Sequence, residues 1–338
     1  MKYKSIIATA KGGPEVLRVV ENDLRAPSAG EARLRILATP VCQDDVAVRQ
    51  GNRPFLPKFP FVPGYATIGV VDALGQGVTT VAVGDRVGAL TNYGSYAEYL
   101  YWDAAKLVPV PTSLDLAEAA TIMLNYLVAQ QILHRVAKVK PGDRVLIVGA
   151  SGGVGTAFLQ LGKLADLVMY GLASESKHPS LTAYGATPIE YRTQDFVQVL
   201  RQAEPEGIDF VFNGMAGEYL ERGMAVLRRG GVLVHYGGPE SFSDFLRLMA
   251  NFIWFSLLPN GKAVKGYGTH RVDQQLLAED WSTLFKALEE GKIQPIVAET
   301  FPLLEAAKAN ALLESGQVTG NVVLLAPELL DSPVMWVE

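Results

Sequence analysis

The fold is decided by the stretch Arg144-Val-Leu-Ile-Val-Gly-Ala-Ser-Gly-Gly-Val-Gly-Thr156. It begins with an apolar run rich in β-branched residues, at positions 145–148, which predicts a buried strand. It leads into residues 156–165, whose apolar spacing is typical of a helix. The turn between strand and helix is crowded with glycine, at positions 149, 152, 153 and 155.

A strand, a glycine turn and a helix in this order suit the pyrophosphate of a dinucleotide. Backbone without Cβ atoms can approach the phosphates closely, and the unpaired N–H groups at the helix start attract their charge. Ala150 takes the place of the first glycine of the usual fingerprint, and glycine turns also occur without a ligand. With its flanking elements the turn predicts nucleotide binding. The residues expected at the phosphates are Ser151, Gly152, Gly153 and Val154.

Length and composition indicate a folded two-domain α/β protein. The chain has 338 residues, of which 49% are hydrophobic and 19% charged, so a disordered chain is excluded. A net charge of −5 without a basic stripe argues against nucleic acid as a partner. The N-terminus lacks the apolar core of a signal peptide, and no charge-free apolar run reaches about 18 residues. We therefore expect a cytoplasmic protein without a transmembrane segment.

Two patterns of predicted secondary structure follow one another along the chain. The first third reads as short strands divided by turns, which is typical of a small barrel or sandwich. The strands expected there are Lys4–Ala10, Glu31–Thr39, Thr67–Leu74, Asp85–Leu90 and Ser95–Tyr101. From Arg144 onward strands and helices alternate, which predicts a doubly wound parallel sheet. The pattern of short strands and turns returns after a helix expected at residues 281–290.

A set of ordered motifs carries a family likeness. They are Val62-Pro-Gly-Tyr65, Val83-Gly-Asp-Arg-Val87, Tyr93-Gly-Ser-Tyr-Ala-Glu-Tyr99, the 149–155 turn, Tyr191-Arg192 and Arg229-Gly-Gly-Val-Leu-Val-His-Tyr-Gly237. The chain resembles the zinc-free quinone oxidoreductase branch of the medium-chain dehydrogenase/reductases. The motifs Pro63-Gly-Tyr65 and Leu124-Asn-Tyr126 resemble the vesicle amine transport protein subgroup.

This resemblance implies an α/β fold with two domains and a cleft between them. A GroES-like, mainly-β catalytic domain would comprise residues 1–120 and 290–338. A Rossmann doubly wound parallel sheet that binds NADP would comprise residues 121–289. Relatives pair the last Rossmann strand across a dimer, so a homodimer is expected with residues 264–268 at the edge.

No metal is expected. Cys42, the one cysteine, stands where zinc-dependent relatives have a catalytic ligand, but their His and Glu positions hold Tyr65 and Ala66. A catalytic zinc needs three protein ligands, so we interpret Cys42 as a small apolar residue in the cleft wall.

The segment after the second Rossmann strand bears on the choice of nicotinamide cofactor. NAD sites usually place an acid at this strand end, but here it carries Ala173 and Ser174, with Lys177 one helical turn later. A hydroxyl and an ammonium suit a 2′-phosphate, although Lys177 could equally be an ordinary surface lysine. Zinc-free relatives match Ser174, Lys177 and Tyr191 and use NADPH, so the resemblance implies NADP.

Further cofactor contacts are expected at Tyr236 and Gly237, where a strand ends, and at Asn321, which resembles a polar cofactor contact of relatives. Each could instead be ordinary turn chemistry. Val128 replaces a threonine that in relatives contacts the nicotinamide, and Asn125 is the expected substitute.

Without zinc, hydride transfer to a quinone or an α,β-unsaturated carbonyl is favoured over alcohol oxidation, because one or two hydrogen-bond donors can stabilise the charge on the substrate oxygen. The candidate donors are Tyr65 and Tyr126, with Asp45 nearby, and each tyrosine could instead be a packed wall residue. The expected partner is a small lipophilic carbonyl compound or quinone.

A second hypothesis is an NADPH-binding interaction protein with little turnover. It is favoured by the apolar stretch 242–258, by Val128 and by Asn52, since enoyl thioester reductases of the superfamily carry a tyrosine after the matching Gln-Gly. The stretch could be a lid, a membrane patch or a helix buried against the cleft or a partner subunit, and we favour the buried helix.

Overall fold

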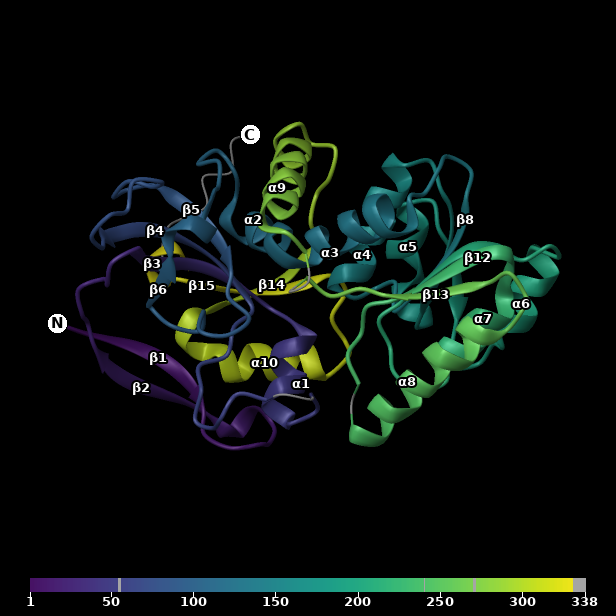
Figure 1. Ribbon diagram of the computed structural model, residues 1–338, viewed down its shortest axis with the longest axis horizontal. Helices are drawn as coiled ribbons and strands as arrows, with labels where there is room; N and C mark the ends of the chain where they lie inside the picture. Colours follow the sequence, from purple (N-terminus) through teal and green to yellow (C-terminus); the bar gives the residue numbers. More distant parts are fainter. Residues whose placement is uncertain (54–55, 240, 270–271, 331–338) are drawn as a thin grey trace.

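The computed structural model describes residues 1–53, 56–239, 241–269 and 272–330. Two β-sheets lie side by side, with helices between and around them (Figure 1). None of the helices in these described ranges is long and apolar enough to cross a bilayer.

The cofactor sheet has six parallel strands, in the order β10 (Thr187–Glu190), β9 (Val168–Ala173), β8 (Arg144–Val148), β11 (Ile208–Asn213), β12 (Leu227–His235) and β13 (Ala263–Gly266). Residues 145–148 of β8 are buried, as a strand covered by helices on both faces requires. The chain order reverses beside β8, the switch point at which ligands bind in such sheets. The expected doubly wound parallel sheet is confirmed.

Helices connect these strands. They are α4 (Gly153–Leu164), α5 (His178–Ala183), α6 (Phe196–Ala203) and α7 (Tyr219–Val226). Gly155 and Gly162 let α4 lie close to the sheet, because a Cβ on Gly155 would come within 2.2 Å of the Gly149 carbonyl oxygen and one on Gly162 within 2.6 Å of the Met169 sulfur.

The catalytic sheet and the separate hairpin of β1 (Lys2–Ala8) and β2 (Leu17–Asp23) confirm the strands expected in the first third, with bounds that differ by a few residues. Six strands follow in the order β14 (Val297–Pro302), β15 (Asn321–Leu325), β3 (Glu31–Val41), β4 (Ala66–Leu74), β5 (Arg86–Leu90) and β7 (Val108–Pro109), and β6 (Tyr99–Asp103) also pairs with β3. The hairpin of β1 and β2 stands beside it. The helices of this half are α1 (Gln43–Gln50), α10 (Ala306–Glu314) and α11 (Pro327–Leu330).

The helical stretch expected at residues 116–137 joins the two halves. It consists of α2 (Leu116–Thr121) and α3 (Leu127–Gln131), each followed by a π-helical turn, Ile122–Tyr126 and Ile132–Ala137. Helix α2 packs on β3 and β4, whereas α3 packs on α4 and on α9 (Gln274–Glu289). The largest apolar cluster therefore runs continuously through this junction.

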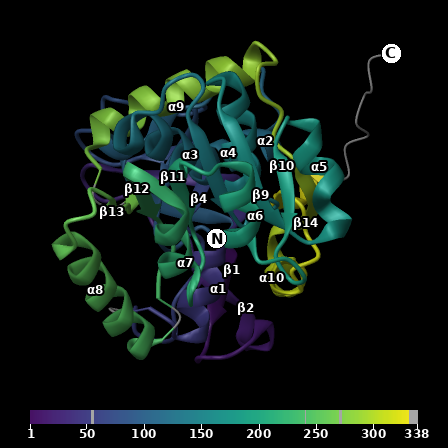
Figure 2. The same ribbon diagram turned by 90° about the vertical axis from the view of Figure 1, so that its right-hand side faces the viewer.

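The expectation that the apolar stretch is buried against the cleft is wrong, whereas burial against a partner subunit stays a prediction. The apolar stretch 242–258 forms α8 (Phe242–Leu257), and none of its residues is buried. Figure 2 shows α8 along the outer edge of the cofactor sheet, where it packs on the neighbouring strand β13. Large side chains on its outer face are mostly exposed: Phe242 by 74%, Ile253 by 63% and Leu257 by 74%. Hydrophobic spacing predicted the helix, but a helix with apolar residues on both faces does not reveal which face is covered.

Candidate active site

The glycine turn lies where the carboxyl end of β8 meets the N-terminus of α4. Gly149 has φ +75°, a conformation that favours glycine, and the N-cap residue Gly152 is exposed with no side-chain cap. The first N–H groups of the twelve-residue helix are therefore free to bind an anion. The sequence-predicted residues Ser151, Gly152, Gly153 and Val154 all lie at this terminus.

Two asparagines from opposite halves meet over Gly153. Asn125 Nδ2 donates to Asn321 Oδ1 at 2.5 Å, and a Cβ on Gly153 would come within 2.4 Å of Asn125 and 2.6 Å of Asn321. Asn125 and Asn321 were both expected at the cofactor, and the structure brings them together at the glycine turn. Next to this pair, Gly320 N donates to the Ser151 carbonyl at 2.9 Å, so the turn is bonded to the catalytic half.

The end of β9 gathers the residues expected at a 2′-phosphate. Ser174 and Lys177 lie on the loop after β9, and Lys177 Nζ donates to the carbonyls of Gly316 and Val318, each at 2.7 Å. Burial, with a contribution from Arg192, lowers the pKa of Lys177. Two of the three ammonium protons are thus used, and one remains for a ligand.

Arg192 adds a second cation here that was not expected as a site residue. It is exposed, its Nε donates to Tyr191 Oη at 3.3 Å, and its guanidinium lies 5.6 Å from the centre of the Tyr191 ring. The signal in the sequence was a basic residue directly after the aromatic one.

At the carboxyl ends of β11 and β12, glycines leave a stretch of backbone without side chains. A Cβ on Gly237 would come within 2.1 Å of the Gly214 carbonyl oxygen, so only glycine fits there. The Tyr236 ring covers Gly214 and packs against Phe158 at 5.7 Å between centroids, and burial raises the pKa of Tyr236. Gly237 thus leaves room for a flat ring, while Tyr236 shapes the wall from the core side.

Tyr65 faces this region from the catalytic half. It lies just before β4, and its Oη is 3.0 Å from Thr269 Oγ1, on the segment after β13. Burial raises the pKa of Tyr65 to about 12, so the phenol stays protonated and can donate a hydrogen bond at neutral pH. Thr269 was not expected, since nothing near it forms a motif.

Asp45 is buried, and its hydrogen bonds hold the loop that carries Tyr65. Its carboxylate accepts hydrogen bonds from Gly64 N at 2.9 Å, Tyr96 Oη at 3.1 Å, and both the N (3.0 Å) and Sγ (3.1 Å) of Cys42. Burial raises the pKa of Asp45 to about 6, against the opposing effect of these donors. The carboxylate thus holds the backbone beside Tyr65 in place.

Tyr126, the second tyrosine expected to act on substrate, lies in the core. It is fully buried in the π-helical turn, and its hydroxyl has no hydrogen-bond partner in the described part of the chain. Burial raises the pKa of Tyr126, with smaller effects from Tyr184 and Glu118. No hydrogen bond in the described ranges joins it to Tyr65 or Asp45.

Arg53 was also missed. Its guanidinium donates through Nε, at 2.9 Å, and Nη2, at 2.5 Å, to the same oxygen of Asp44, and it lies flat against Gly238, where a Cβ would come within 2.3 Å of Cζ. It is the residue two places after the Gln50-Gly51 pair. The position therefore brings a cation, not a phenol, to the backbone at Gly238.

These residues do not suit a zinc ion. The Cys42 thiol is held by Asp45, Tyr65 stands in the place of a histidine ligand, and no cluster of three or more His, Cys, Asp or Glu side chains occurs in the described ranges.

Comparisons with known proteins agree with this geometry. Residues 28–112 match the family described as "Alcohol dehydrogenase GroES-like domain", and residues 184–324 match "Zinc-binding dehydrogenase". A "2-haloacrylate reductase" from Burkholderia sp is 33% identical over 93% of this chain and 96% of its own. The human "Synaptic vesicle membrane protein VAT-1 homolog" is 30% identical over 95% of this chain and 86% of its own. Escherichia coli quinone oxidoreductase, solved with NADPH, has a TM-score of 0.86 at 26% identity over 95% and 99% of the two chains.

The chain belongs to the medium-chain dehydrogenase/reductase superfamily, with a Rossmann sheet and a GroES-like sheet. Within it, the chain falls in the zinc-free quinone oxidoreductase branch, and it is an oxidoreductase by family. The resemblance inferred from the motifs is confirmed.

Proposed function

We propose that this protein is an NADPH-dependent, zinc-independent reductase of a quinone or an α,β-unsaturated carbonyl compound. The observation that carries the proposal is the set of groups that the two halves bring together around the glycine turn and the end of β12. An anion-binding helix terminus and a glycine-lined backbone lie on one side, and the protonated phenol of Tyr65 reaches across from the other. Relatives named as a haloacrylate reductase and as a quinone oxidoreductase bound to NADPH support the same activity.

Each residue has a defined task in this proposal. The N–H groups at the start of α4 bind the pyrophosphate, and Lys177 with Arg192 binds the 2′-phosphate. When bound, NADPH supplies a hydride to the substrate carbon. Tyr65 donates a hydrogen bond to the substrate oxygen, on which negative charge develops, and the surrounding burial strengthens that bond.

The test is NADPH oxidation against a panel of quinones, enones, haloacrylates and saturated aldehydes. We expect turnover with the conjugated acceptors and little with the saturated aldehydes, because only conjugated substrates place the charge on a remote oxygen. A protein that binds NADPH tightly but reduces none of the panel would contradict the proposal.

That outcome would favour the second candidate, an NADPH-binding interaction protein. The specific observation in its favour is the outward apolar face of α8, together with relatives named as vesicle membrane proteins. We expect the protein to be cytoplasmic, which cell fractionation tests.

We further propose a homodimer that covers this face and the exposed edge of β13. Replacing two outer residues, Ile253→Glu and Leu257→Glu, should convert the dimer to a monomer in sedimentation analysis. Leu164→Glu, at an equally apolar exposed site at the end of α4, is the control and should leave the mass unchanged. A wild-type protein that sediments as a monomer at every concentration would contradict the dimer.

A further inference from the structure

The hydroxyl pair of Tyr65 and Thr269 joins the two halves of the cleft. Tyr65 belongs to the loop before β4, Thr269 to the segment after β13, and their oxygens are 3.0 Å apart. Thr269 is 7% exposed, so water has little access to the bond. Either hydroxyl can donate to the other, and the one that accepts keeps its own proton for a further partner.

The surroundings of Tyr65 oppose the formation of negative charge on its oxygen. Burial raises the pKa of the phenol, and Asp44, Cys42 and Tyr93 raise it further. The hydrogen bond from Thr269 acts in the other direction, because a hydroxyl that donates to the phenol oxygen favours its charged form. Thr269 is therefore placed to oppose the effect of burial when Tyr65 gives up its proton.

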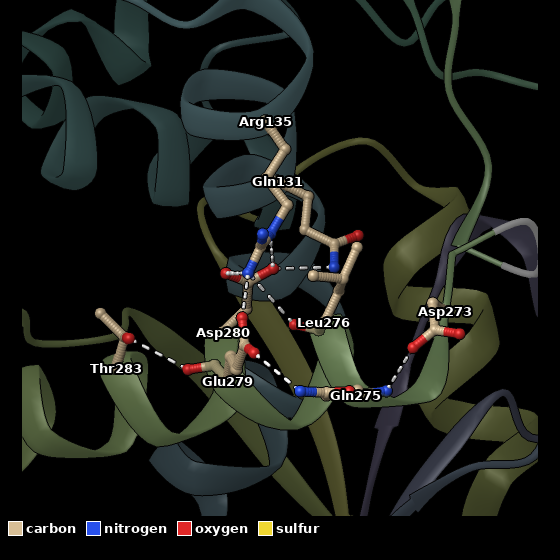
Figure 3. A network of polar contacts seen from close by, with 8 residues as sticks. All are labelled: Gln131, Arg135, Asp273, Gln275, Leu276, Glu279, Asp280 and Thr283. Carbon is tan, nitrogen blue, oxygen red and sulfur yellow. Dashed lines mark hydrogen bonds and ion pairs between the residues drawn. The ribbon is translucent and has the colours of Figure 1, made fainter.

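A polar network fixes the segment on which Thr269 lies, and Figure 3 shows its part at Gln131, Arg135 and Asp280. Two residues earlier, Tyr267 Oη donates to Gln131 Oε1 at 2.5 Å, and Gln131 Nε2 donates to Asp280 Oδ2 at 2.9 Å. Arg135 closes the network with bonds to both oxygens of Asp280, at 2.7 and 2.9 Å. The segment is thus held by α3 and α9 at Tyr267 and by the catalytic half at Thr269.

We propose that Thr269 is a positioning residue that acts through Tyr65: its hydroxyl donates to the phenol oxygen and directs the phenol proton at the substrate. This inference rests on the proposed reductase function. When hydride adds to the conjugated substrate, the displaced electron pair ends on the carbonyl oxygen. That oxygen takes the Tyr65 proton, the negative charge passes to the phenol oxygen facing Thr269, and water later returns a proton to Tyr65.

The decisive readout is the acidity of Tyr65 itself, measured without cofactor. A 3,5-difluorotyrosine placed at position 65 is more acidic than tyrosine and reports its titration by fluorine NMR. In that protein, Thr269→Val should raise the pKa of the phenol by about one unit, whereas Thr269→Ser should restore it. Thr283→Val is the control, because the Thr283 hydroxyl also makes a single bond, to the Glu279 carbonyl at 3.0 Å, but on the exposed side of α9 (Figure 3).

With the natural tyrosine, Thr269→Val should lower kcat about tenfold while KM changes less than threefold, and Thr269→Ser should recover most of the loss. An unchanged phenol pKa in Thr269→Val, or a loss of kcat in Thr269→Ser that equals or exceeds the loss in Thr269→Val, would overturn the proposal; a loss confined to the Ser variant would indicate a space-filling role of the methyl group. A wild-type protein that reduces no acceptor would instead overturn the proposed function, and the fluorine titration would still decide the pairing of the two hydroxyls.

The network is tested by Tyr267→Phe, which removes one hydroxyl. We expect a smaller loss in kcat than with Thr269→Val, and no additional loss when the two are combined, because Tyr267 acts only by holding Thr269. Tyr101→Phe is the matched control, since Tyr101 also bonds through its hydroxyl, to the Arg25 backbone, but on β6. Additive losses in the double variant would contradict a shared role.

Discussion

Arg53 of the catalytic half donates a hydrogen bond at 2.9 Å to the carbonyl oxygen of Pro239, which follows β12 of the cofactor sheet. Asp44 holds the guanidinium on one side, and the absence of a side chain at Gly238 lets it lie on the backbone. This bond spans the cleft beside the glycine-lined stretch that we assign to the nicotinamide half of the cofactor. It adds to the contacts that Asn125 with Asn321, Gly320 with Ser151 and Tyr65 with Thr269 make between the two halves.

Removing this bond should loosen the closed cleft. We expect Arg53→Met to weaken NADPH binding about tenfold, the effect of losing one charged hydrogen bond, and to speed hydrogen exchange at residues 236–238. Gly238→Ala should give the same result, because its Cβ would collide with the guanidinium. Gly266→Ala, whose Cβ would meet only ordinary contacts at 3.5 Å, is the control. Unchanged affinity and exchange in Arg53→Met would refute the role of the bond.

Cofactor preference should depend on two cations, not one. We expect the wild-type protein to bind NADPH at least tenfold more tightly than NADH in calorimetry, since a 2′-phosphate gains charge-assisted bonds. Lys177→Ala and Arg192→Ala should each reduce the preference, and the double variant should abolish it. Lys308→Ala, which removes an exposed lysine paired with Glu305, should have no effect. Equal affinities for the two cofactors in the wild-type protein would disprove the assignment.

Neighbouring glycines of the phosphate turn should respond differently to alanine. Gly153→Ala forces a Cβ into the Asn125–Asn321 pair and should lower the free energy of unfolding by about 1–3 kcal/mol. Gly152→Ala meets nothing closer than 3.5 Å and has an ordinary φ of −77°, so it should change stability little. Urea denaturation of the cofactor-free protein checks both. Equal stabilities of the two variants would mean that the asparagine pair yields to the added methyl group.

Asp45 should leave a signature in the pH dependence of stability. Its pKa is raised to about 6 in the folded protein, so between pH 4 and 6 the folded state holds a proton that the unfolded state has lost. The stabilisation from that proton is complete below pH 4 and disappears as the pH rises through 6. Relative to Asp45→Asn, the free energy of unfolding should therefore fall by about 3 kcal/mol over this interval and then stay level. A difference that rises across it would indicate a carboxylate stabilised by its four donors.

Much of the fold could be predicted because its signals are local. The strand, glycine turn and helix around residues 144–165 need their glycines for steric reasons that the sequence displays, and β-branched runs marked most strands of both sheets. The pattern could not say how α8 is covered, since that depends on which surfaces meet in space. The expected bounds of the two domains, at residues 120 and 290, stay a prediction.

The site could be predicted only in part. A motif or a spacing marks Ser151 to Val154 and Lys177, and their contacts with the cofactor stay a prediction. Thr269 and Arg53 could not be found, because their partners are far away in the sequence. The bonds to Tyr65 and Pro239 span 204 and 186 positions. Tyr126 shows a second reason, since the sequence pattern of an apolar helix does not tell whether its aromatic residue faces a cleft or the core.

The bond from Gly320 N to the Ser151 carbonyl bears on how such chains can recombine. Strand β15 of the catalytic sheet begins next to the backbone of the phosphate turn. The two halves therefore cannot be exchanged independently of one another. A hybrid that takes residues 149–155 from one parent and 318–321 from another would join two surfaces never selected together. Gene shuffling among these reductases should therefore yield folded progeny mainly when both segments descend from the same parent.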